Sequence, residues 1–226
     1  LSLKVAALSA TLAVVLGTLA GLVLARFGPF RGRTLLSGMT TAPLVMPEVI
    51  TGLSLLLLFV TLEQLIGWPR GRGMTTIVIA HVTFAMAFVT VIVQSRMAQL
   101  DDSLEEAAQD LGARPAKVFF LITLPIVFPA LLSGWLLAFT LSLDDLVIAS
   151  FVAGPGSSTL PMVVFSKVRL GVSPDINALA TILVSVVAVG VVIAGFTMAR
   201  QQKVRDRDAQ MALAANQEMV ESLKKG

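Results

Sequence analysis

The chain contains no cysteine, has a single histidine and carries few charges. Without cysteine it forms no disulfide bond and offers no thiolate to a metal ion. One histidine rules out a multi-histidine metal site within this chain, so we expect no metal. Charged residues make up only 14% of the sequence, whereas a soluble domain carries about 25%. This composition indicates too little polar surface to cover the protein in water, and the lipid bilayer is its expected solvent.

The sequence also lacks the G-x-x-x-x-G-K-[ST] loop that cradles nucleotide phosphates. We therefore expect that this chain does not bind or hydrolyse ATP by itself and is not an enzyme. No nucleophile–base pair stands out, and a net charge of +3 does not by itself argue for nucleic acid. If the chain drives an energy-requiring process, another subunit must supply the energy.

Long apolar stretches dominate what the chain does contain. Hydrophobic residues make up 56% of it, and the mean hydropathy is +0.87. A transmembrane helix needs about 20 mostly apolar residues, and five stretches reach that length. We predict an all-α polytopic membrane protein. Its predicted spans are Val5–Ala25, Ala42–Leu62, Met74–Ser95, Ile126–Val152 and Ile176–Ala199.

Basic residues gather in the segments after the first, third and fifth apolar stretches. These segments hold twelve of the 17 lysine and arginine residues. The positive-inside rule therefore places the loop at 96–125 and the polar tail at 201–226 in the cytoplasm, with 1–200 as the transmembrane domain. The chain begins with Leu1, and a preceding helix would bring the expected spans to six with both ends inside.

The loop at 96–125 carries the most specific pattern in the chain. Glycine readily adopts the left-handed conformation that ends a helix, and proline suits a first helical turn. We therefore predict two short helices joined at Gly112, the second beginning at Pro115, with Pro125 starting the return into the membrane. Asp101, Asp102 or Ser103 can cap the first helix.

Apolar side chains of the first short helix recur at i, i+3, i+4 and i+7 and make one face. Such a face can dock into a groove on a partner protein, or it can lie on the lipid surface as an interfacial helix. The residues that we expect to contact a partner are Glu106, Ala107, Ala108, Gly112, Arg114, Leu124 and Pro125.

Ionisable residues inside apolar stretches are costly and are candidates for function. Asp144 and Asp145 point about 100° apart on a helix, so one can line a cation path while the other caps or pairs. The alternative is two solvated acids at the outer end of the helix. Glu48 follows Pro47, which can kink its helix, and is a cation ligand or a structural partner. We expect His81 to be a hydrogen-bonded packing group, with a proton or substrate role as the alternative.

These patterns together resemble a known family. The spacing E-A-A, Gly and I-x-L-P resembles the coupling loop of ABC importer permeases. Stretches at 42–52, 133–151 and 171–181 are similar to the second permease subunit of spermidine/putrescine importers, most closely those for putrescine. The resemblance, over residues 1–199, implies a type I importer permease fold in the bacterial inner membrane. It also implies a second related permease, a periplasmic polyamine-binding protein, and two cytoplasmic ATPase subunits that hold ATP and Mg and receive the coupling loop.

The implied cargo is a polyamine, a chain of ammonium groups joined by methylenes. It needs spaced carboxylates and aromatic faces, which attract organic cations. The expected path residues are Asp144, Asp145, Glu48, Trp135 and Phe139. Three alternatives stay open. The first is a related importer of ferric ion, sulfate or another small solute. The second is a secondary transporter with a proton relay through the two aspartates and His81, and the third is a membrane-embedded enzyme.

Overall fold

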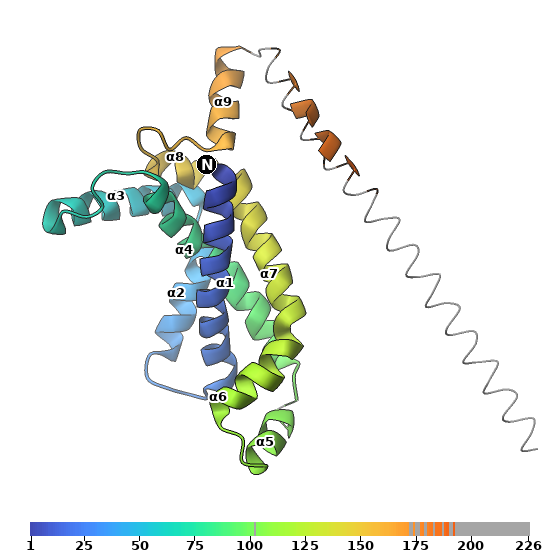
Figure 1. Cartoon of the computed structure of the whole chain (residues 1–226). Coiled ribbons are helices and arrows are strands. Elements are labelled where there is room, and N and C mark those ends of the chain that lie inside the picture. The colour runs from blue at the N-terminus through green and yellow to red at the C-terminus, as the bar shows by residue number, and fades with distance from the viewer. Residues whose placement is uncertain are drawn as a thin grey trace, which may run out of the picture. The chain divides into compact units, whose positions relative to one another are not determined.

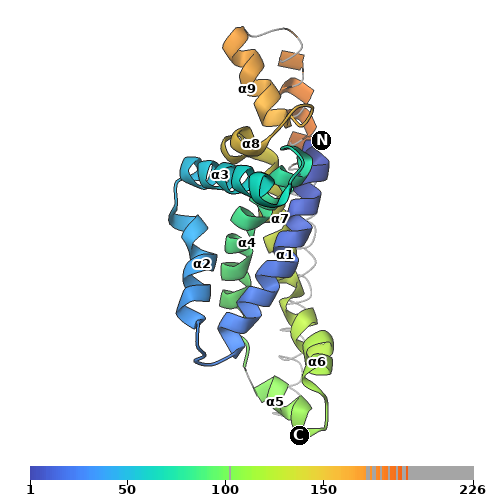
Figure 2. The ribbon, with the colours of Figure 1, turned by 90° about the vertical axis from the view of Figure 1, so that its left-hand side faces the viewer.

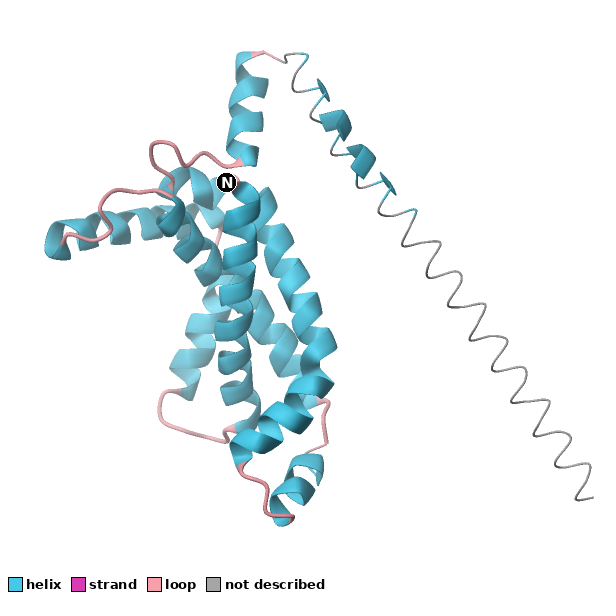
Figure 3. Cartoon of the chain, in the orientation of Figure 1, coloured by secondary structure: helices cyan, strands magenta, loops and turns pink. Residues whose placement is uncertain are grey.

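The computed structural model describes residues 1–101 and 103–171, together with scattered positions between 174 and 192. Every regular element among the described residues is a helix (Figure 3), which confirms the predicted all-α class. The chain forms two compact units, Leu1–Ser166 and Lys167–Gly226. Most of the predicted span at Ile176–Ala199 and all of the tail at 201–226 lie outside the described residues.

The described helices follow one another with short connections. They are α1 (Ser2–Arg26), α2 (Arg33–Val45), α3 (Glu48–Ile66), α4 (Met74–Ala98), α5 (Ser103–Asp110), α6 (Pro115–Val118), the π-helical turn η1 (Phe119–Thr123), α7 (Leu124–Asp144), α8 (Val147–Val152) and α9 (Leu160–Leu170). Four segments of the described chain are long and apolar enough to cross a membrane: α1, α3, α4 and the continuous stretch from α6 to α7.

The first unit is built around α4, which lies against α1 and α7 (Figures 1 and 2). Two glycines let α1 approach α4 closely. A Cβ atom on Gly17 would lie 2.8 Å from the Val89 side chain, and one on Gly21 would lie 3.0 Å from Val93. Small residues four apart allow such approach of two membrane helices. In the most apolar stretch of α4, 67% of the residues are buried, against 17% in the stretch that ends in α7. Much of α7 is therefore left uncovered by the described residues.

The predicted span at Ala42–Leu62 has its ends misplaced, because the structure breaks the chain between α2 and α3 and the apolar span is α3 (Glu48–Ile66). Met46 and Pro47 are both extended, with ψ angles of 136° and 134°. A residue before proline is pushed out of the helical region by the proline ring, so a helix commonly ends there. Glu48 is consequently the first residue of α3 and lies at the end of this span, not six residues inside it. α3 then runs across the direction of α1 and α4 (Figures 1 and 2).

The predicted span at Ile126–Val152 has both ends misplaced. The helical stretch already begins at Pro115, and η1 joins α6 to α7 without a break. Pro125 has no N–H to donate to the carbonyl of residue 121, and the wider π-helical turn lies at this position. At the other end α7 stops at Asp144, because Asp145 is extended with ψ 125°, and α8 begins two residues later at Val147.

Buried side chains form two clusters along the bundle. One joins α3, α4 and α8, and includes Phe59, Ile77 and Ile148. The second joins α1, α4 and α7, and includes Met97 and Val127 near the α5 end. Each cluster adjoins a group of polar side chains, one around His81 and the other around Glu105.

Candidate functional site

The loop between α4 and α7 forms the two predicted short helices, α5 and α6. The Asp101 carboxylate accepts the backbone N–H of Ser103 at 3.0 Å, which makes it the observed cap. This bond and one from the Ser103 hydroxyl lower the pKa of Asp101. Gly112 has φ +84°, the left-handed conformation that ends α5, and Pro115 opens α6. The other candidate cap, Asp102, lies outside the described residues.

The predicted partner-contacting residues fall into two groups. Four of them are exposed on or just after α5: Glu106, Ala107, Gly112 and Arg114; Ala108 is half-buried. Leu124 and Pro125 belong to the first turn of α7, and Leu124 packs against the second buried cluster. No α5 side chain is buried within the described chain, and 51% of Leu104 is exposed. Of the apolar face of α5, Ala107 and Leu111 are thus available to a partner, whereas Leu104 and Ala108 are partly covered.

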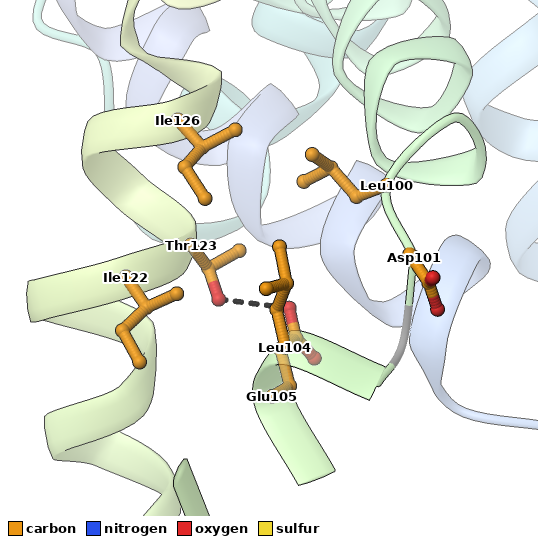
Figure 4. Close-up of a pocket in the computed structure, with 7 residues that line it drawn as sticks. All are labelled: Leu100, Asp101, Leu104, Glu105, Ile122, Thr123 and Ile126. Atoms are coloured by element: carbon orange, nitrogen blue, oxygen red, sulfur yellow. Dashed lines mark hydrogen bonds between the residues drawn. The ribbon is translucent and has the colours of Figure 1, made fainter. Parts of the chain in front are cut away.

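Glu105 links three helical segments and was missed by the sequence analysis as a site residue. Its Oε1 atom accepts a hydrogen bond from Thr123 Oγ1 at 2.8 Å (Figure 4). The same atom accepts one from Arg26 Nη2 at 3.4 Å. Its Oε2 atom lies 3.4 Å from Arg26 Nε. We call Arg26, Glu105 and Thr123 the Glu105 cluster. Since Arg26 and Glu105 are 79 positions apart, no local pattern could reveal the pair.

Apolar side chains surround the Glu105 cluster. Leu104 points toward Leu100 and Ile126 in a small hollow (Figure 4). On another side, an open groove of about 440 Å³ is lined by Arg26 and Glu105 together with aromatic and aliphatic residues of α1, α6 and η1. Low-polarity surroundings strengthen an ion pair relative to one in bulk water.

A second polar group, the His81 cluster, lies at the α8 end of the bundle. His81 Nδ1 is 2.6 Å from Ser142 Oγ, and His81 Nε2 is 3.1 Å from Asp145 Oδ2. The Asp145 carboxylate also accepts the backbone N–H groups of Ile148 at 3.2 Å and Ala149 at 2.7 Å. The side chains of His81 and Asp145 are 2% and 6% exposed. His81 is therefore a hydrogen-bonded packing group, and Asp145 both caps α8 and pairs.

Asp144 is exposed and occupies a different face of α7. At 100° per residue, Ser133, Thr140 and Asp144 fall on one stripe, and all three are exposed. We call these three residues the α7 polar stripe. An acid on an exposed stripe of a membrane helix is costly unless it faces a partner or water.

The structure does not bring the other expected path residues to Asp144. Trp135 and Phe139 stack with ring centres 5.2 Å apart, and Trp135 Nε1 donates to Thr11 Oγ1 at 3.1 Å. By the same helical spacing they lie on the α1 side of α7, opposite the polar stripe. Glu48 is exposed at the start of α3.

A family model matches residues 14–206 of the chain, and its description is "Binding-protein-dependent transport system inner membrane component". The match covers well over half of the chain, and the chain belongs to this family. It is therefore a multi-pass membrane component of a transport system, as the apolar helices indicate.

Two relatives from Escherichia coli (strain K12) are similar over most of their length. One is the putrescine transport system permease protein PotI, 64% identical over 212 residues that cover 94% of this chain and 75% of PotI. The other is the spermidine/putrescine transport system permease protein PotC, 41% identical over 201 residues that cover 89% and 73%. Both confirm the resemblance drawn from the sequence.

The fold is similar to a chain from the inward-facing MetNI methionine ABC transporter. The TM-score is 0.67, and the match covers 88% of this chain and 91% of that chain at 16% identity. At this identity the likeness shows the fold alone. It confirms the predicted importer permease fold.

Proposed function

We propose that this chain is a permease subunit of an ATP-driven polyamine importer. The observation that carries the proposal is the 64% identity to a putrescine permease across 94% of the chain. The discrete helix pair α5–α6, carrying the E-A-A pattern at one end of the bundle, supports the ABC class. In the complex this chain forms half of the path with a second related permease. A periplasmic polyamine-binding protein delivers cargo, and two cytoplasmic ATPase subunits hold ATP and Mg.

The proposed ATPase contact is α5. Its exposed apolar and small side chains fit the helix-in-groove mode of recognition, with Glu106 and Ala107 at the surface. Arg114 is exposed at the start of α6 and adds a charged contact on the same side. This arrangement requires the loop at 96–125 and the tail at 201–226 to lie in the cytoplasm, as the basic residues predict.

For the cargo path we favour Asp144 over Asp145. Both oxygens of Asp145 accept hydrogen bonds inside the protein, whereas Asp144 is exposed on the α7 polar stripe, one helical turn from Thr140. The stripe would face the second permease across the path, where an ammonium group can exchange water for a carboxylate. Glu48, Trp135 and Phe139 stay predictions from the resemblance.

The test is uptake of labelled putrescine into proteoliposomes that contain the complete complex and its binding protein. We expect ATP-dependent uptake, lost with Glu106→Arg although the complex still assembles. Arg70→Gln changes an exposed charge between α3 and α4, at the opposite end of α4 from α5, and is the control. If putrescine is not taken up but another loaded binding protein stimulates ATP hydrolysis, the ABC class stands and the cargo is wrong.

Asp144 is tested in the same assay. Asp144→Asn removes the charge with little change in size. We expect the KM for putrescine to rise about tenfold, which corresponds to about 1.4 kcal/mol of lost binding. An unchanged KM in the assembled complex would remove Asp144 from the path.

A further inference from the structure

We propose that Glu105 is a positioning residue that carries the motion of α5 into α1 and the η1–α7 helix at once. The proposal rests on the proposed function, in which an ATPase moves α5. It concerns the residue just before the E-A-A pattern, which faces the membrane helices instead of a partner. One carboxylate, on α5, is bonded to side chains from the end of α1 and from η1.

The packing of α5 makes such a link necessary. None of its side chains is buried, and short turns at 99–101 and 111–114 connect it to its neighbours in the chain. Turns of this kind bend when a helix is pushed. A displaced helix moves its neighbours only through contacts that hold, and here those contacts are Leu104 in its hollow and the Glu105 cluster (Figure 4).

The Glu105 cluster is held on the α1 side by charge and geometry. Arg26 is the last residue of α1, where the helix dipole favours a cation. Arg26 Nη2 donates to Glu105 Oε1 at 3.4 Å and Arg26 Nε lies 3.4 Å from Glu105 Oε2, so the contact is an ion pair with one hydrogen bond. The side chains are 15% and 21% exposed, so salt screens the pair less than a pair at the open surface.

On the other side the same carboxylate holds η1. Thr123 is 3% exposed and donates its hydroxyl to Glu105 Oε1, the shortest contact of the cluster. η1 continues into α7, which ends at Asp144. A displacement of α5 is therefore passed to α1 and to the η1–α7 helix through the Glu105 carboxylate, and the two helices move together.

The test compares transport with ATP hydrolysis in the same proteoliposomes. For Glu105→Ala we expect putrescine uptake per ATP hydrolysed to fall at least about fivefold, the lower end of usual coupling between two sites. ATP hydrolysis itself should persist, because the exposed face of α5 is unchanged. Glu105→Gln keeps an acceptor for Thr123 but loses the charge, so its ratio should lie between those of Glu105→Ala and the wild type.

The double variant Arg26→Glu with Glu105→Arg restores an ion pair with reversed charges. We expect it to recover part of the ratio that either single variant loses, a result that a general loss of stability would not give. Arg70→Gln, an exposed charge between α3 and α4, is the control and should match the wild type.

Two outcomes would overturn the proposal. One is a ratio for Glu105→Gln equal to that of Arg70→Gln, and the other is no recovery in the double variant. If the Glu105→Ala complex does not assemble, these two comparisons still test the proposal. A wild-type complex that ignores putrescine but responds to another loaded binding protein refutes the cargo alone, and the ratio is then measured with that cargo.

Discussion

The two ends of the bundle each hold a carboxylate that joins separate helices, but in different surroundings. Asp145 is 6% exposed and is bonded to a buried histidine and two backbone N–H groups. Glu105 is 21% exposed and is bonded to side chains at an edge of the bundle, beside an open groove. Backbone partners cannot rotate away, whereas an arginine and a threonine side chain can. The partners of Asp145 therefore keep it in one position. Those of Glu105 can follow a movement of their helices while the contacts are kept.

This difference has an energetic counterpart. Removing one member of a buried polar pair leaves the other without a partner in low-polarity surroundings, and the cost is several kcal/mol. Water can replace the lost partner of a partly exposed group such as Glu105, so the loss of stability is smaller. We therefore expect variants at the His81 cluster to lower stability and variants at the Glu105 cluster to lower coupling.

The largest expected effect on stability is that of His81→Ala. It removes both hydrogen-bond partners that the ring provides and leaves Ser142 and Asp145 buried without it. We expect a loss on the order of 3 kcal/mol. Thermal inactivation of the purified complex in detergent measures it. Asp144→Asn, at the exposed neighbour of Asp145, should leave the midpoint unchanged, and an equal shift in both variants would refute the contrast.

A smaller loss is expected where α3 packs on α8. A Cβ atom on Gly52 would lie 2.7 Å from Phe151 Cδ2 and 3.3 Å from Ile148 Cα. Gly52→Ala should therefore force α8 away from α3, at a cost of about 1–3 kcal/mol. Gly38→Ala in α2 is the matched control, because nothing lies within 4 Å of its added methyl group. Alanine favours a helix over glycine by about 1 kcal/mol, so the control should be neutral or slightly stabilising.

Glu105→Ala should lower stability less than either of these variants. A half-exposed pair contributes about 1 kcal/mol or less, and the loss should shrink further in high salt. Thermal inactivation at low and high ionic strength measures both effects. A loss as large as that of His81→Ala would mean that the Glu105 cluster is a fixed structural contact.

The local features of the fold followed from the sequence, and its long-range contacts did not. Gly112 and Pro115 punctuate α5 and α6 through their own backbone preferences, so both helices were predictable. The role of His81 as a packing group also followed from its apolar setting. At Pro47 the sequence predicted a kink, whereas the structure ends one helix and begins another. Hydropathy cannot detect this break, because the residues of the turn are as apolar as those of the helices.

The site contacts that sequence reasoning missed join distant positions. Glu105 looked like an ordinary acid in a first helical turn until α1 and η1 were brought to it. Likewise, the choice between Asp144 and Asp145 depended on where α7 ends. Adjacent acids on a continuous helix differ only in direction, whereas here one ends α7 and the other caps α8.

The smallest expected effect concerns a third carboxylate, Asp101, which is fully exposed and shapes only the turn before α5. Its bond to the Ser103 N–H lowers its pKa below the ordinary 3.8, so the charged form is favoured by the folded turn. The stabilisation is therefore complete above that ordinary value and is lost as the pH falls through the lowered pKa.

Amide hydrogen exchange at Ser103, corrected for the intrinsic rate, measures this dependence. Protection should be constant from neutral pH down to about pH 5 and should fall only in strong acid. Asp101→Asn keeps an acceptor oxygen but loses the charge, so its protection should be lower and independent of pH. A wild-type protection that already falls near about pH 6 would mean that Asp101 is not the group that stabilises this turn.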